Sequence, residues 1–184
     1  MHDNIRTASA VDSFVSRSSA FEASVKAPHL HYAFECLDKD GNLKWTAEFD
    51  NLVTTAGLNY ILGTGAVVAV AKYLGLVDGS GTPTFSASDT IGSHTGWTEN
   101  TDYTQTARGT ITWGSASAGS MSSSSAVTFS INATATIAGA FSVSDSTKGG
   151  TTTGTIYSEG AFTGGNKSVA SGDTLNVSIT LSFS

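Results

Sequence analysis

The sequence is poor in cysteine and in charge, and each shortage excludes a class of protein. Cys36 is the single cysteine, so no intramolecular disulfide and no zinc site of several cysteines can form. Charged residues make up 13% of the 184 residues, nine residues are basic, and the net charge is −6. Nucleic-acid binding needs a basic surface that displaces counterions, so nucleic acid is not an expected partner.

Long apolar runs are also missing. The stretch GAVVAVAKYLGLV (65–77) is interrupted by Lys72 and is shorter than the ~20 apolar residues of a membrane-spanning helix. The opening residues MHDNIRTASAVDSF include acidic residues and lack the apolar run of a secretory signal. We therefore expect no membrane partner, and synthesis in a reducing compartment.

Serine and threonine make up more than a quarter of the chain, and they alternate with apolar residues. HLHYAFEC (29–36) and LKWTAEF (43–49) show this alternation on either side of the turn DKDGN, in which Gly41 is free to take a positive φ. The pattern predicts a β-hairpin. The row Leu175–Phe183 alternates strictly and predicts a final strand with one buried and one hydroxyl-rich face.

Weaker signals fill the middle of the chain. A short helix capped by Asn51 or Thr54 is expected, with Leu58, Ile61 and Leu62 as its apolar side. The next strand is expected at Lys72–Val77 and is followed by the turn DGSGTP. Further strands are expected around Ile111–Trp113, Val127–Ile131, Ala135–Val143 and Ile156–Phe162, with the low-complexity stretch Ser115–Ser125 as a loop.

This pattern predicts an all-β protein: residues 28–184 form an antiparallel β-sandwich, for which a jelly roll is one arrangement. Residues 1–27 form an extended N-terminal arm outside that domain. The arm is either a disordered tail or a segment that becomes ordered on a partner, with Phe14 and Phe21 as its anchors.

The stretch SDTIGSHTGWTEN (88–100) concentrates residues that can carry chemistry. Asp89, His94 and Glu99 could bind a metal or form an acid–base pair, but their spacing in a glycine-containing loop matches no recognised metal motif. The alternative is that Asp89 caps a turn and Trp97 anchors the loop on the core. A further alternative is sugar binding: Trp45 and Trp113 lie on the apolar faces of their strands, so Trp97 is the one tryptophan that could be exposed for stacking on a sugar.

Other candidate sites give weaker signals. His29 and His31 lie on one face of the first strand and could bind a metal with Glu48 or His94 as the third ligand. The alternative is two surface or interface histidines. DKDG lacks the further carboxylates of a calcium loop. Neither a nucleophile elbow nor a phosphate loop is present, and Cys36 lies on the apolar face of its strand. No enzymatic activity and no cofactor are expected.

Several segments in a fixed order resemble small β-rich virion proteins of tailed bacteriophages. These segments are WTAEFDNLVTTAGLNYIL (45–62), YLGLVDG (73–79), the stretch from Asp89 to Arg108, GAF (139–141) and GDTLNVSITLSFS (172–184). The resemblance covers roughly residues 29–184 and leaves out the arm.

The resemblance implies a non-enzymatic capsid decoration (cement) protein that is assembled in the host cytoplasm and located on the virion. Its expected partners are the major capsid protein, other virion proteins and further copies of itself, with a trimer as the expected oligomer. The expected interface residues are Phe14, Phe21, His94, Trp97, Glu99 and Arg108, with Arg108 paired to Glu99 or an acidic neighbour. The first alternative is a tail or fibre component that binds another tail protein or a host glycan. The second is a metal-dependent β-barrel enzyme.

Overall fold

Alternating apolar and polar residues build the first of two antiparallel sheets, sheet A. The structure is a computed structural model that describes residues 29–54, 56–57, 71–115, 120–150 and 152–182. Sheet A contains β1 (His29–Leu37), β2 (Leu43–Asp50), β7 (Ser120–Ser122), β8 (Val127–Ser130) and β12 (Thr174–Ser182). The strand order is β2-β1-β12-β7, and β8 also pairs with β12. The first and last described strands are therefore neighbours, with His29 opposite Ser182.

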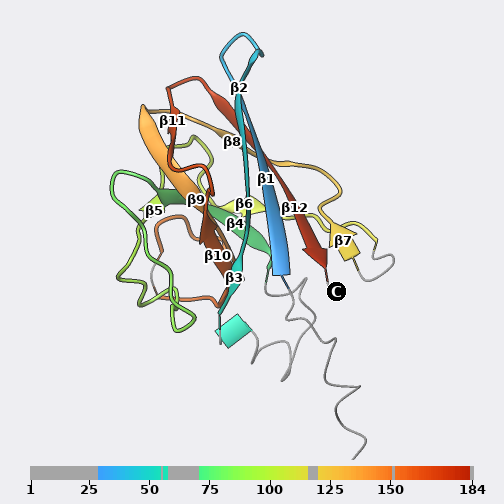
Figure 1. Ribbon diagram of the computed structural model, residues 1–184, viewed down its shortest axis with the longest axis vertical. Coiled ribbons are helices and arrows are strands. Elements are labelled where there is room, and N and C mark those ends of the chain that lie inside the picture. Colours follow the sequence, from blue (N-terminus) through green and yellow to red (C-terminus); the bar gives the residue numbers. More distant parts are fainter. Residues whose placement is uncertain (1–28, 55, 58–70, 116–119, 151, 183–184) are drawn as a thin grey trace, which may run out of the picture.

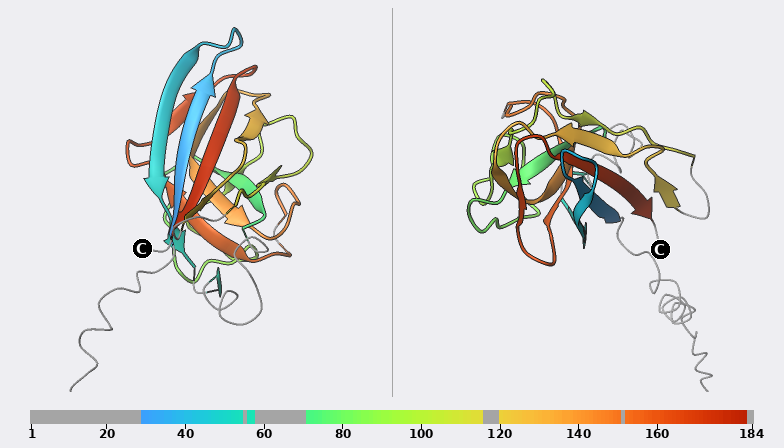
Figure 2. Two further views of the ribbon diagram at one scale, coloured as in Figure 1. Left: turned by 90° about the vertical axis from the view of Figure 1, so that its right-hand side faces the viewer. Right: turned by 90° about the horizontal axis from the view of Figure 1, so that it is seen from above.

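Sheet B contains mostly shorter and more fully buried strands. They are β3 (Leu52–Val53), β4 (Tyr73–Asp78), β5 (Glu99–Asn100), β6 (Gly109–Thr110), β9 (Ala135–Val143), β10 (Ile156–Ala161) and β11 (Lys167–Val169). The order is β3-β10-β9-β4-β5, with β11 beside β9 and β6 beside β4. All of these strand pairs are antiparallel. In Figure 2 the blue, cyan and red strands of sheet A form one layer and the green and orange strands of sheet B form the other.

The two sheets bury one continuous core between them, so the chain folds as the predicted all-β sandwich. β12 contributes Leu175, Val177, Ile179 and Leu181, each at most 3% exposed. Each such side chain contributes about 1.5–3 kcal/mol by leaving water. The intervening residues of β12 point outward, and a shift of one residue in register would exchange the two faces.

The predicted β1–β2 hairpin is confirmed, together with its turn. Gly41 adopts φ +84°, a conformation that L side chains rarely take. The carboxylate of Asp38 accepts hydrogen bonds from the backbone N–H groups of Asp40 (2.9 Å) and Asn42 (2.8 Å), which closes the turn. Figure 1 shows this tip at the opposite end of the molecule from the last described residues of β12.

Two sequence predictions differ from the structure. The stretch Ser115–Ser125, expected to be a loop, contains β7, whose Ser122 pairs with Thr180. Pairing is compatible with low complexity here, because Met121 packs against the core and the hydroxyl of Ser122 bonds that of Thr180. Ile111 and Trp113, expected in a strand, follow β6, and Trp113 forms only an isolated bridge to Ser123.

The expected helix is seen only at its start. Residues 56–57 are helical, and the hydroxyl oxygen of Thr54 accepts the N–H of Gly57 at 3.0 Å, as an N-cap residue does. The expected apolar side, Leu58, Ile61 and Leu62, lies outside the described residues. No helix in the described part of the chain is long and apolar enough to cross a membrane.

Candidate functional site

Residues 79–98 form an irregular segment that covers the outer face of sheet B; we call it the covering segment. In Figure 1 it is the green loop beside β4 and β5. Beneath it lies a second apolar cluster, separate from the core between the sheets. Its buried members are Val77, Ile91, Trp97, Ala138, Phe141, Val143 and Ile156. The stretch 88–100 is therefore part of the covering segment and of β5, and it contributes side chains to this cluster.

Trp97 anchors the covering segment, as one of the two interpretations predicted. The residue is 5% exposed, and its ring lies 4.8 Å from that of Phe141 on β9. The ring of His94 stacks on the indole at 4.0 Å, and His94 Nδ1 lies 3.0 Å from the carbonyl oxygen of Trp97. The alternative in which Trp97 is exposed for sugar stacking is wrong, because Phe141 and His94 cover the indole.

Asp89 caps a turn inside the covering segment. Its Oδ2 accepts the backbone N–H of Ser86 at 3.2 Å and the indole N–H of Trp97 at 3.3 Å. The residue is 8% exposed. The nearby carboxyl of Glu159, on β10, is fully buried, and no described side chain or backbone group gives it a hydrogen bond of acceptable geometry.

Glu159 was missed by the sequence analysis. It follows Ile156, Tyr157 and Ser158, and a register shift between Ile156 and Ser158 turns the strand so that Glu159 faces the covering segment. A bulge of this kind leaves no mark in the alternation of apolar and polar residues. The only signal was a carboxylate inside a predicted strand.

Glu99 and Arg108 form a buried ion pair, which confirms the pairing expected from the sequence. Arg108 donates from Nε to Oε1 at 3.0 Å and from Nη2 to Oε2 at 2.8 Å. The same guanidinium donates to the carbonyl oxygens of Asp145 (3.1 Å) and Gly150 (3.0 Å). It also lies 5.1 Å from the centre of the Phe141 ring. The pair therefore fixes β5, the chain just before β6 and the 145–150 loop to one another.

The proposed metal ligands do not converge. Asp89 binds Trp97, His94 stacks on Trp97, and Glu99 binds Arg108, so their side chains serve three different structural contacts. His31 lies 3.0 Å from Asp50 and 3.6 Å from Glu48 on the exposed face of the hairpin. Among the residues that the structure describes, no group of three or more His, Cys, Asp or Glu side chains is placed to hold a metal ion.

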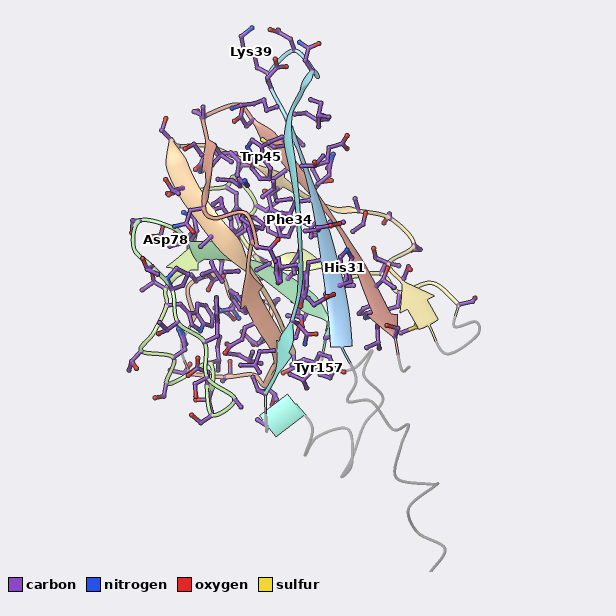
Figure 3. All side chains as sticks on the ribbon, viewed as in Figure 1. His31, Phe34, Lys39, Trp45, Asp78 and Tyr157 are labelled. Atoms are coloured by element: carbon purple, nitrogen blue, oxygen red, sulfur yellow. The ribbon has the colours of Figure 1, made fainter. Side chains whose placement is uncertain are left out.

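Two other predicted features have a structural role. Cys36 is fully buried, and burial, followed by the charge of Asp173, raises the pKa of its thiol to about 11. Trp45 and Trp113 pack against the core, and their indole N–H groups donate to the carbonyl oxygens of Ser168 and Ala71. Figure 3 shows Trp45 on the hairpin above Phe34.

The outer face of sheet A, unlike that of sheet B, is not covered by any other described segment of the chain. Toward β2 it carries the carboxylates Glu35, Glu48 and Asp50. On β12, β8 and β7 it presents hydroxyl and amide groups, most of them in cross-strand pairs. These residues are Ser122, Thr128, Ser130, Thr174, Asn176, Ser178 and Thr180. Ser122 bonds Thr180 at 2.9 Å and Thr128 bonds Asn176 at 2.9 Å, so the face is ordered by its own side chains.

The predicted interface residues differ in how deeply they are buried. Trp97 and Arg108 are buried within their own chain, whereas His94 and Glu99 are partly buried in contact with them. Phe14 and Phe21 lie outside the described residues. The role of all six at an interface stays a prediction. Comparison of the chain with protein-family models, curated proteins and solved structures found no match.

Proposed function

We propose that this protein is a non-enzymatic structural protein of a tailed-phage particle that attaches to the capsid surface as an oligomer and stabilises it. The observation that carries the proposal is the outer face of sheet A: its neighbouring strands present ordered, mostly uncharged hydroxyl and amide groups. Burying such groups against another protein costs less than burying charges. The opposite sheet is closed by the covering segment.

The segments that resemble virion proteins form the framework of this sandwich. They include β2, β4, the covering segment with β5, the middle of β9, and β12. The resemblance therefore rests on residues that build both sheets. This agrees with a protein whose task is to present a rigid surface.

The charge distribution favours a partner with basic groups near the hairpin. Residues 1–28 contain three basic and three acidic residues, so the whole net charge of −6 belongs to residues 29–184. On the outer face of sheet A the acidic groups gather on β1 and β2, toward one edge. A capsid protein that presents lysine or arginine opposite this edge would fix the orientation of binding.

The described chain begins at the same end of the sandwich at which β12 finishes, since His29 lies opposite Ser182. In the proposed function, residues 1–27 reach from this end to a neighbouring copy or capsid subunit. The second contact then forms at a high effective concentration and strengthens attachment. Removing residues 1–27 is expected to leave the domain folded and to weaken binding to the particle.

Copy number and position on purified phage particles test the proposal most directly. Quantitative mass spectrometry that finds hundreds of copies, with antibody labels over the head, supports the capsid assignment. A few copies, labelled at the tail, would move the protein to the tail alternative. Absence from the purified particles would refute the proposal.

A pair of matched variants tests the binding face. Ser178→Arg places a long charged side chain in the centre of the outer face of sheet A, whereas Ser93→Arg places it at an exposed position of the covering segment. We expect Ser178→Arg to weaken binding to particles lacking the protein by roughly tenfold or more, the effect of about 1.4 kcal/mol. Ser93→Arg is expected to bind as the parent does, with circular dichroism confirming that both fold.

A further inference from the structure

A buried pair of acidic groups joins the covering segment to sheet B. Glu159 projects from β10 beneath the segment and is fully buried, while Asp89 comes from the segment itself and is 8% exposed. The neighbours of Glu159 on the adjacent strands are Phe141 on β9 and Leu52 on β3. The two carboxyl groups thus come from different elements and act on one another beneath the covering segment.

No cation of the described residues compensates this pair. The groups that act on the Glu159 carboxyl are Asp89 and the N–H groups of Ser86 and Trp97; lysine and arginine are not among them. The nearest histidine in the segment, His94, is stacked on Trp97. The N–H groups of Ser86 and Trp97 meet Asp89 Oδ2 with hydrogen-bonding geometry and leave both oxygens of Glu159 without a described donor.

A buried carboxyl group without a donor is stable only when it carries its own proton. A protonated Glu159 donates to Asp89, which completes the hydrogen bonding of both groups. Burial, followed by the charge of Asp89, raises the pKa of Glu159 to about 8. Geometry and electrostatics therefore agree that a proton occupies the pair at neutral pH.

We propose that Asp89 and Glu159 share one proton, which fastens the covering segment to sheet B, and that losing this proton in mildly alkaline solution releases the segment. Two negative charges would then face one another under Trp97. The segment's other contacts with the domain include the apolar cluster, backbone bonds at its two ends, and the bonds from Asn166 to the carbonyls of Gly79 and Gly81. Release would expose the outer face of sheet B.

The sign of the pH dependence follows from the direction of the shift. The folded protein holds the Glu159 proton more tightly than the unfolded chain does. The stabilisation is complete below about pH 4.5, the ordinary pKa of a glutamate, and is lost as the pH rises towards about 8. Across that range each pH unit shifts the folding equilibrium by roughly tenfold through this one group.

The test compares the full chain with Glu159→Gln in urea unfolding between pH 5 and pH 9. A glutamine is neutral at every pH and can donate to Asp89, so we expect Glu159→Gln to lose the pH dependence and to be the more stable protein at pH 8. The control Glu35→Gln removes an exposed carboxylate of sheet A and should keep the parent's slope. A parent and a Glu159→Gln variant with the same slope would overturn the proposal.

Local release has its own measurement. The ratio of the hydrogen-exchange rate of residues 79–98 to that of β12 should rise between pH 6 and pH 9 in the parent and stay constant in Glu159→Gln. Carbon NMR of the parent labelled at glutamate carboxyls would keep the proposal testable if the variant fails to fold. A Glu159 signal that is fully ionised at pH 6 would refute the shared proton.

Discussion

Replacing Arg108 by alanine removes one partner of the buried ion pair and leaves the other without compensation. The guanidinium side chain has no exposed surface and that of Glu99 is 7% exposed. Losing one member of such a pair costs about 3–5 kcal/mol, because the remaining charge stays buried and the carbonyls of Asp145 and Gly150 lose their donor. For a domain of this size, that loss lowers the melting temperature by roughly 6–20 °C.

Urea unfolding followed by tryptophan fluorescence and circular dichroism measures this loss. The matched control is Lys39→Ala, which breaks the exposed contact between Lys39 and Asp40 and should cost less than about 1 kcal/mol. The double variant Glu99→Leu with Arg108→Met removes both charges and should recover much of the lost stability. An Arg108→Ala protein within about 1 kcal/mol of the parent would refute our account of this pair.

Two further predictions concern the core. Gly139→Ala should destabilise the protein severely, because the added Cβ would lie 1.9 Å from the carbonyl oxygen of Gly160. The control Gly81→Ala places a Cβ with no atom within 4 Å and should be nearly neutral. Thermal unfolding of both variants checks this, and equal melting temperatures would contradict it. Cys36 should resist alkylation by iodoacetamide at pH 8 in the native protein and react once urea unfolds it, because its thiol is buried and its pKa is raised to about 11. Rapid labelling of the native protein would show that the strand opens readily.

The strands that are long and regular could be predicted from the sequence. β1, β2 and β12 alternate without interruption, and burial of a single face is enough to produce that pattern. The turn at Gly41 was predictable for the same local reason, since DKDGN combines a positive-φ glycine with an aspartate that bonds its own backbone.

Contacts between distant segments were harder to predict. The pairing of Arg108 with Glu99 could be named because the two residues are close in sequence, but the carbonyls of Asp145 and Gly150 come from a loop about forty residues away. Glu159 was missed because a bulge, not the alternation, decides which face it takes. Sequence periodicity predicts regular strands, whereas these contacts depend on a loop and on a bulged strand.

The antiparallel register of β1 and β12 also determines how the protein can carry added sequence. Because His29 and Ser182 lie side by side, a peptide fused beyond Ser182 would leave the sandwich beside the start of β1. The turn between Asp40 and Gly41 lies at the far end and is exposed. An epitope or cargo tag inserted there would face away from His29 and Ser182, since exposed loop tips tolerate insertions well.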